Sequence, residues 1–178
     1  MQLSQTILTQ QSAISPSFKQ YLTFNTGGEC YALGILLVKE IIEFGGITKI
    51  PLMPTFVRGV INLRGAVVPV IDLSARLYGK CVDEGKRTCI VIVEVPNNAD
   101  GMTELGVVVD GVNEVLELNS AELTAPPQFG SKIRTDFIEA MARLSDRLLM
   151  ILAPEKVLSV EEMASLVAVT EHVNSQEH

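Results

Sequence analysis

The feature that most constrains the fold is a succession of short apolar segments separated by glycine, proline, asparagine and aspartate. One of them, CIVIVEV at 89–95, is apolar at almost every position and therefore predicts a strand that is buried on both faces. About ten such segments can be distinguished between residues 17 and 152. Because closely spaced short strands are typical of barrels and sandwiches, the sequence predicts a mainly β protein.

Several motifs indicate where strands turn back or end. NLRG at 62–65 interrupts an apolar stretch and predicts a hairpin turn, and Asp110-Gly111 is the strongest two-residue hairpin signal in the chain. Pro69 lies in the second half of the same apolar stretch, where a proline suits an edge strand or a bulge. Asp72 ends this stretch, and we expect it to cap a short helix, LSARLYG, rather than to act in catalysis.

Helical signals occur towards the C-terminus. Ser159 and Glu162 form a capping box, and the apolar positions that follow recur at helical spacing, so a helix is predicted over 160–171. The segment FIEAMARLSDRLLMIL at 137–152 leaves two readings open. Its composition favours a helix, whereas its second half, RLLMIL, is typical of a buried strand.

Composition and charge exclude several classes of function. The chain has 178 residues, enough for one domain, and its 14 basic and 21 acidic side chains give a net charge of −7. Because phosphate binding needs a basic surface, neither nucleic acid nor an anionic membrane surface is expected as a partner. No signal peptide is recognised, and the apolar runs are far shorter than the ~20 residues of a membrane helix. We therefore expect a soluble, cytoplasmic protein without direct membrane insertion.

The sequence lacks the residue sets that enzymes and metal sites use. Both histidines, His172 and His178, lie at the C-terminal end, and no nucleophile motif, phosphate-binding loop or zinc-binding motif is present. Cys30, Cys81 and Cys89 do not have metal-like spacing and are expected to be small buried thiols. We therefore expect a binding protein with no catalytic residues, no metal and no cofactor.

Two charged residues lie among apolar neighbours. In KEIIEF, strand alternation places Glu40 on one face with Ile42 and Phe44, and Arg64 interrupts the apolar stretch around NLRG. An unpaired buried charge is costly, so one hypothesis is that Glu40 and Arg64 pair with each other. The alternative is that each side chain reaches solvent at the end of its strand.

Two apolar residues show the opposite anomaly. Ile41 and Val115 each lie on a strand face whose neighbouring side chains are polar. Single exposed apolar residues are common, whereas several that converge on one surface make a partner-binding site. The sequence by itself does not show whether these two converge.

Four motifs carry a resemblance to a known family. They are, in chain order, FVRGVINLRGAVVPVIDL at 56–73, GVVVDGVNEVLEL at 106–118, LSDRLLMIL at 144–152 and VEEMASL at 160–166. Together they resemble the CheW family of bacterial chemotaxis coupling proteins, over most of the chain. The resemblance implies two intertwined five-stranded SH3-like β-barrels that share a hydrophobic core, with short helices and a C-terminal helix.

The resemblance also decides between the two readings of the ambiguous segment. Its counterpart in the family is a strand hairpin, so residues 136–152 are expected to be β, with the turn at Ser145-Asp146. The implied domain organisation is a flexible N-terminal tail at 1–16, a CheW-like domain at 17–172 and a C-terminal tail at 173–178. Within the domain we expect two lobes, roughly 17–85 and 86–152, followed by the helix at 160–171.

The activity that the resemblance implies is scaffolding. Members of the family hold the histidine kinase CheA, through its regulatory domain, against the cytoplasmic hairpin tips of chemoreceptors, the methyl-accepting chemotaxis proteins. We expect a protein that is a monomer when isolated and is recruited to membrane receptor arrays. One alternative is an adaptor of the same fold in a sister pathway, such as pilus motility or surface sensing. Another, from a different class, is a small-ligand-binding β-barrel.

The resemblance assigns two sets of contact residues. A receptor tip is expected in a groove between the barrels, contacted by Ile35, Val38, Glu40, Ile41, Gly59, Arg64 and Val115, with Glu40 and Arg64 paired. The kinase surface is expected around Ile47 and Thr48, and Phe129 matches an aromatic residue of a second kinase contact or ring-forming contact. Thr124 stands where a basic residue is expected, and the loop 96–104 is longer than usual and has no assigned function.

Overall fold

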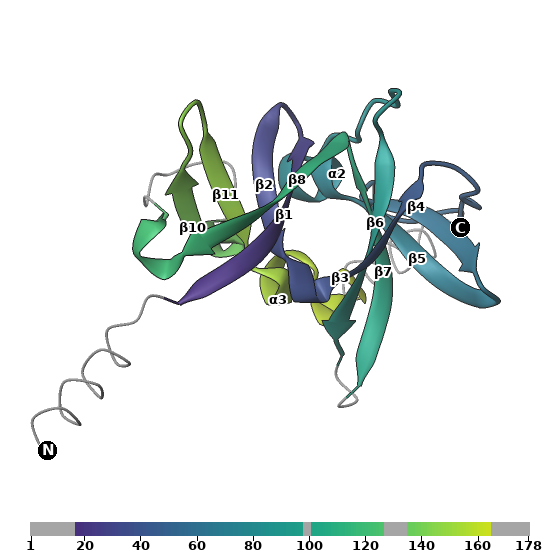
Figure 1. Cartoon of the computed structure of the whole chain (residues 1–178). Coiled ribbons are helices and arrows are strands. Elements are labelled where there is room, and N and C mark those ends of the chain that lie inside the picture. Colours follow the sequence, from purple (N-terminus) through teal and green to yellow (C-terminus); the bar gives the residue numbers. More distant parts are fainter. Residues whose placement is uncertain (1–16, 98–100, 127–134, 165–178) are drawn as a thin grey trace, which may run out of the picture.

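The computed structural model describes residues 17–97, 101–126 and 135–164, whose strands form two β-sheets (Figure 1). One sheet has the strand order β8 (Gly111–Asn119), β1 (Phe18–Thr26), β2 (Glu29–Gly34), β11 (Leu148–Leu152), β10 (Ile138–Arg143) and β9 (Leu123–Thr124). The other sheet has the strand order β3 (Val38–Glu43), β6 (Cys89–Pro96), β7 (Met102–Val109), β5 (Ala66–Asp72) and β4 (Val57–Leu63). The mainly β fold is confirmed, and the two-residue β9 adds a sixth strand to the first sheet.

Within the described residues, each sheet has a core of its own and a further core lies between the sheets. The first sheet buries Tyr21, Cys30, Ala32, Leu118, Ala142, Leu149 and Ile151. The second buries Ile61, Val68, Val70, Val82, Ile90, Ile92 and Val108. The shared core takes side chains from both sheets, among them Phe24 and Leu33 from the first and Val93 and Val107 from the second. A shared core of this kind is what two SH3-like barrels with a common interior require.

Strand β6 shows why a segment can be apolar at nearly every position. Its successive side chains point to opposite faces. Ile90 and Ile92 enter the core of the second sheet, whereas Val91 and Val93 enter the shared core. Burying a side chain of this size stabilises the fold by about 1.5–3 kcal/mol, so both faces of β6 contribute.

The two sheets take their strands from both halves of the chain. Strands β1 and β2 pair with strands that follow residue 110, and β2 runs parallel to β11 with Cys30 opposite Leu149. The stretch between them, from β3 to β7, makes the other sheet. The boundary expected between residues 85 and 86 therefore does not separate the two sheets, because β1 and β2 lie with the C-terminal strands.

The hairpin expected at Asp110-Gly111 is wrong. Strand β7 ends before these residues in one sheet, and β8 begins at Gly111 in the other, so the chain crosses between the sheets here. Asp110 holds this crossing, because its backbone N–H donates to Asn25 O at 2.9 Å and its Oδ2 accepts from Gly27 N at 2.9 Å. A side chain at position 111 would meet Arg87 at 3.2 Å, so the glycine allows a close approach rather than a turn.

From Ile138 to Leu152 the ambiguous segment forms a β-hairpin, as the resemblance implied, whereas Asp136 and Phe137 belong to a 3-10 helix at Thr135–Phe137. Strands β10 and β11 pair with Met141 opposite Met150, and Leu144 N donates to Arg147 O at 2.8 Å across the turn at Ser145-Asp146. The helix propensity of its first half is overridden because Ala142 and Leu149 are buried in the core of the first sheet.

Short helices join the strands. They are the 3-10 helices η1 at Ile35–Leu37, η2 at Ser120–Glu122 and η3 at Thr135–Phe137, and the α-helices α2 at Leu73–Tyr78 and α3 at Pro154–Val157. A further helix begins at Val160 and continues to the end of the described range at Ala164, and Ser159 caps it by accepting from Glu162 N at 3.3 Å. The rest of the helix predicted over 160–171 lies outside the described residues, as does the predicted tail at 1–16.

A buried arginine joins the helices to the shared core. Arg76 of α2 lies over the rings of Phe56 and Phe137, 5.5 and 4.8 Å from their centroids, and its side chain is only 6% exposed. Its Nε donates to Val157 O at 3.0 Å, and its Nη2 lies 3.2 Å from Glu162 Oε1. Arg76 therefore connects α2, α3 and the C-terminal helix.

Candidate partner-binding site

The hairpin between β4 and β5 places Arg64 at a tight turn. Leu63 pairs with Ala66, which leaves Arg64 and Gly65 as a two-residue loop, and their φ angles are +54° and +85°. Positive φ at both positions is what a type I′ turn requires. Asn62 supports the turn, because its Oδ1 accepts from Gly65 N at 2.9 Å. The NLRG motif thus encodes the hairpin that was predicted and presents the arginine at its tip.

The salt bridge between Glu40 and Arg64 is confirmed. Arg64 Nη2 lies 2.9 Å from Glu40 Oε2, with side-chain exposures of 77% and 26%. Glu40 points to the same face of β3 as Ile42, which packs on the core of the second sheet, so the alternation read from the sequence also holds. Because the arginine is largely exposed, we expect the pair to contribute no more than about 1 kcal/mol to folding stability. Its contribution lies in the shape and charge of the surface.

Three further charged residues extend this pair, and the sequence reasoning missed them. Lys39 Nζ lies 2.6 Å from Glu104 Oε1 and 3.9 Å from Glu94 Oε1. The register between β3 and β6 shifts between Val38 and Glu40, a bulge that lets the neighbours Lys39 and Glu40 both engage in ion pairs. The hydrogen bond that Lys39 donates to Glu104 raises the pKa of the amine above its usual value. A bulge leaves no signal in a simple alternation of apolar and polar residues.

Ile41 and Val115 both face the shared core. Ile41 pairs with Val91 across β3 and β6, and Val115 pairs with Leu22 across β8 and β1. Opposite residues share a face of the sheet, and both partners belong to the shared core. Strands β3 and β8 are edge strands, so the side chains of Ile41 and Val115 remain 45% and 49% exposed. The two apolar anomalies of the sequence thus lie at edges that border the same core.

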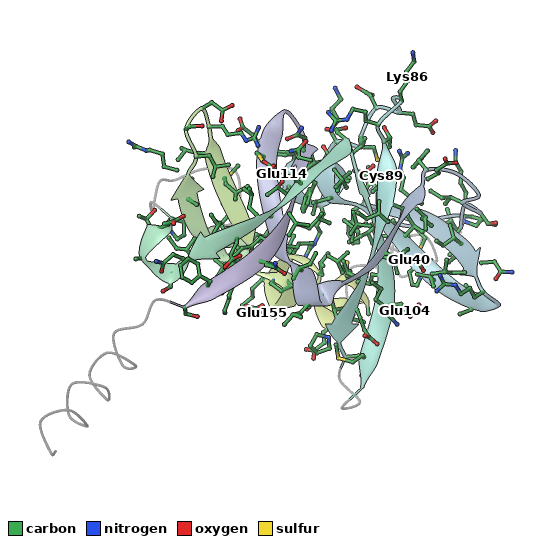
Figure 2. The ribbon with its side chains drawn as sticks, in the orientation of Figure 1. Glu40, Lys86, Cys89, Glu104, Glu114 and Glu155 are labelled. Atoms are coloured by element: carbon green, nitrogen blue, oxygen red, sulfur yellow. The ribbon has the colours of Figure 1, made fainter. Side chains whose placement is uncertain are left out.

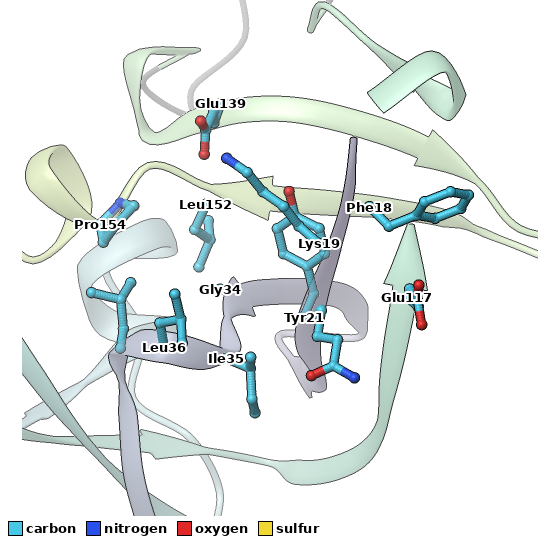
Figure 3. A pocket seen from close by; sticks show the side chains of 12 residues that line it. Phe18, Lys19, Tyr21, Gly34, Ile35, Leu36, Glu117, Glu139, Leu152 and Pro154 are labelled. Atoms are coloured by element: carbon cyan, nitrogen blue, oxygen red, sulfur yellow. The ribbon is translucent and has the colours of Figure 1, made fainter. Parts of the chain in front are cut away.

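An open cavity of about 540 Å³ lies beside the shared core (Figure 3). Ile35 and Leu36 of η1 line one part of it, and Phe18, Tyr21 and Glu117 of the first sheet line another. Leu36 is 99% exposed, although a leucine between two packed apolar residues gives no sign of this in the sequence. Val38, the residue that begins β3, packs against the shared core rather than lining the cavity.

Gly59 is buried and supports the segment that contains Ile47 and Thr48. Its φ of +140° is rarely adopted by other residues, and a Cβ there would lie 2.1 Å from Thr48 O. Thr48 and Val60 exchange both backbone hydrogen bonds, at 2.8 and 2.9 Å. A residue assigned to the receptor therefore lies in contact with the two residues assigned to the kinase.

Arg58, the neighbour of Gly59 in β4, forms an ion pair with Asp72. Arg58 Nε lies 3.2 Å from Asp72 Oδ2, and its guanidinium is 5.4 Å from the ring centroid of Phe44. Asp72 has no exposed surface and accepts from Ala75 N and Val82 N, each at 3.0 Å. The predicted helix cap at Asp72 is confirmed, but its ion pair with Arg58 was not foreseen.

The remaining predicted positions are less central. Phe129 lies outside the described residues. Thr124 is exposed in β9, and its Oγ1 donates to Met141 O at 3.3 Å. Pro69 does not lie on an edge strand, because β5 pairs with both β4 and β7. It directly precedes the residues that pair with β7, where its missing N–H removes no ladder bond to that strand.

The described residues contain neither a cluster of metal ligands nor a membrane-spanning helix. No group of three or more His, Cys, Asp or Glu side chains in these ranges could hold a metal ion. No helix in them is long and apolar enough to span a membrane. The three cysteines are free thiols, Cys30 buried and the other two partly buried.

Comparisons with known proteins identify the family. The model of the CheW-like domain family matches residues 20–162. Chemotaxis protein CheW of Klebsiella aerogenes is 35% identical over 146 residues, 82% of this chain and 85% of that protein. CheW of Bacillus subtilis is 32% identical over 149 residues, 84% of this chain and 92% of that protein.

A solved structure agrees with both the sequence comparisons and the fold. The scaffolding protein TtCheW of Thermoanaerobacter tengcongensis superposes with a TM-score of 0.71 at 33% identity, covering 83% of this chain and 92% of that one. The order of the motifs, the shared core between two sheets and these matches lead to one conclusion. This chain belongs to the CheW family and is a chemotaxis coupling adaptor.

Proposed function

We propose that this chain holds the histidine kinase CheA, through its regulatory domain, against the cytoplasmic hairpin tip of chemoreceptors at membrane arrays. We also propose that it has no catalytic activity of its own. The observation that carries the proposal is the placement of Ile41 and Val115 on edge strands that border the shared core. Exposed apolar side chains beside a pair of charges suit an amphipathic helical hairpin, whose apolar stripe packs against them.

The receptor surface in this proposal combines apolar and charged residues. Ile35, Ile41 and Val115 supply exposed or partly exposed apolar area beside the shared core, against which Val38 also packs. The salt bridge between Glu40 and Arg64 supplies the charged rim. Apolar contacts of this kind provide affinity, and charges at the rim provide orientation and association rate.

The kinase surface in this proposal is the segment of Ile47 and Thr48. Thr48 is exposed, and its backbone is fixed against Val60 by two hydrogen bonds. Because Gly59 is buried beneath this segment, we infer that a substitution there acts on the kinase surface rather than through direct receptor contact. Phe129 stays a candidate for a second contact.

Co-sedimentation tests the proposal. Membranes that contain receptors are incubated with this chain, with CheA, and with both. We expect the chain to sediment with the receptors, and CheA to sediment with them in quantity only when the chain is present. A matched variant, Arg64→Ala, should lower the recovery of the chain in the pellet because it removes the charged partner of Glu40. Equal recovery of CheA with and without the chain would contradict the proposal.

A further inference from the structure

The hairpin of β6 and β7 extends beyond the rest of its sheet. Along β6, the last residue that pairs with β3 is Val93, and along β7 the pairing with β5 begins only at Gly106. Beyond these points, Glu94 pairs with Glu104, Val95 with Thr103, and Pro96 with Met102. In the described ranges this part of the hairpin, residues 94–97 and 101–104, is therefore a two-stranded ribbon without a neighbouring strand. It is the stretch that the family resemblance left without a function.

A two-stranded ribbon is marginally stable in water unless something holds it. Within the ribbon, Asn97 Nδ2 donates to Thr103 Oγ1 at 2.8 Å, and Val95 anchors one strand in the shared core, where it is only 1% exposed. Lys39 connects the ribbon to β3, because its Nζ lies 2.6 Å from Glu104 Oε1 and 3.9 Å from Glu94 Oε1. One lysine on the bulge of β3 thus reaches both strands of the ribbon.

The ribbon continues the face of the sheet that carries Glu40. Glu40 pairs with Ile92, and Glu94 lies two residues further along β6, so their side chains share a face. Glu104 pairs with Glu94, and Figure 2 shows Glu104 below Glu40 on the same side of the molecule. Together with Lys39 and Arg64, these acids form a row of alternating charges from the β4–β5 turn to the ribbon.

Beyond the charges, the same face becomes apolar. Met102 lies two residues before Glu104 in β7, so their side chains share a face. Met102 pairs with Pro96 and is 52% exposed. A flexible, polarisable methionine adapts to different apolar partners. The row of charges therefore ends in an exposed apolar side chain at the far end of the ribbon.

We propose that Lys39 is a positioning residue that holds the ribbon beside Glu40 and Arg64, and that the ribbon extends the charged rim of the receptor-binding surface on the face of the sheet opposite to Ile41. Met102 would contact the apolar stripe of a receptor helix there. This inference rests on the proposed function, because it assigns an additional contact to the same receptor hairpin. It also accounts for the lysine on the bulge, because from there it reaches Glu94 and Glu104, which lie beyond the last residue of β6 that pairs with β3.

A charge swap tests the inference. We would measure binding of purified receptor hairpin fragments to the full chain, to Lys39→Glu, to Glu104→Lys and to the double variant that carries both changes. Each single variant should weaken receptor binding about three- to tenfold, because like charges then push the ribbon away from β3. The double variant restores an opposite pair and should bind within about twofold of the unaltered chain.

Two controls separate positioning from general effects. Lys86→Glu makes the same change in net charge at the opposite end of the molecule (Figure 2) and should leave receptor binding unchanged. Met102→Ser should weaken receptor binding without altering the unfolding midpoint, because the side chain is already half exposed. Binding of the kinase regulatory domain should stay within about twofold for all variants, since the surfaces share no residues.

The outcomes are distinguishable. If the unaltered chain fails to bind receptor fragments, the proposed function falls and this inference falls with it. If the unaltered chain binds and Lys39→Glu binds equally well, the inference is overturned and the proposed function stands. A double variant that binds as weakly as the two single variants combined would also overturn it, because the pair would then not position the ribbon.

Discussion

Arg58 Nε lies 3.2 Å from Asp72 Oδ2, and the carboxylate has no exposed surface. The pair connects the bulged strand β4 to the start of α2, and Asp72 also accepts hydrogen bonds from Ala75 and Val82. The segment of Ile47 and Thr48 rests on the same part of β4, through Gly59 and Val60. The proposed kinase surface therefore rests on the part of β4 that this charged pair connects to α2.

Asp72→Asn should destabilise the fold. The amide retains an oxygen for one hydrogen bond but leaves the partly buried Arg58 without its counter-charge, and it cannot accept as many bonds as the carboxylate. Breaking such a pair should lower the free energy of unfolding by about 2–4 kcal/mol, measured by urea denaturation. Asp83→Asn makes the same change at an exposed position and should have little effect. A loss below about 0.5 kcal/mol in Asp72→Asn would show that the pair is not a structural support.

Gly59→Ala should displace the segment of Ile47 and Thr48. The new Cβ would lie 2.1 Å from Thr48 O, and φ is +140° at this position. Gly28→Ala is the matched control, because Gly28 also has a positive φ, +83°, but nothing lies within 4 Å of a Cβ there. We expect a loss of about 1 kcal/mol in the control and at least about 3 kcal/mol in Gly59→Ala.

The position of the amide resonances in nuclear magnetic resonance spectra distinguishes strain from displacement. Gly59→Ala should shift the amide signal of Thr48 and weaken kinase binding, whereas Gly28→Ala should do neither. If both variants lose the same stability and leave Thr48 unchanged, the close approach at Gly59 is not what holds the segment.

All three cysteines should react slowly with alkylating reagents. Burial is the leading cause that raises the pKa of Cys30, Cys81 and Cys89 above the ordinary value of a thiol, and Asp72 adds to the effect at Cys81. A raised pKa keeps the thiol protonated at pH 8, and the thiolate is the reactive form. Iodoacetamide at pH 8 should therefore modify the native protein more slowly than the protein in urea. Equal rates at Cys81 in the two conditions would contradict this account.

The sign of the effect on stability follows from the same shifts. The pKa of each thiol is higher in the folded protein than in the unfolded chain. The folded state is therefore most stable at pH values below the unfolded pKa, where the thiol is protonated in both states. Stability should therefore fall as the pH rises through and beyond the usual thiol range near 9. Replacement of the three cysteines by alanine should remove this part of the pH dependence.

Local signals predicted those parts of the fold that depend on neighbouring residues in the chain. The turn at Arg64-Gly65, the cap at Asp72 and the start of the helix at Ser159 each depend on side chains within three residues. The pairing of Glu40 with Arg64 spans 24 residues, but two charges in apolar strands were enough to suggest it.

Other parts of the structure depend on contacts that a linear pattern does not contain. Asp110-Gly111 has the composition of a hairpin turn, yet the strands on either side join different sheets because each finds its apolar partners there. Residues 137–143 have a helical composition, and their conformation is set by pairing with β11. Lys39 was missed because a bulge, not alternation, brings it to Glu104.

The exposed apolar residues show the same limit. The sequence indicated that Ile41 and Val115 are each on a polar face, but only the registers of β3 with β6 and of β8 with β1 place both beside the shared core. Leu36 gave no signal, because its exposure follows from the turn of η1 rather than from its neighbours.

The central claim is that receptor and kinase bind separate surfaces. Isothermal titration of Val115→Glu against receptor hairpin fragments and, separately, against the kinase regulatory domain tests it most directly. A glutamate at this half-exposed apolar position would be desolvated without a partner in the proposed receptor contact, so receptor affinity should fall about ten- to a hundredfold while kinase affinity stays within about twofold. Leu148→Glu, at an apolar residue that is 50% exposed in β11, is the control and should bind both partners normally. Equal losses for both partners in Val115→Glu, with the variant still folded, would mean one shared surface and would contradict the account.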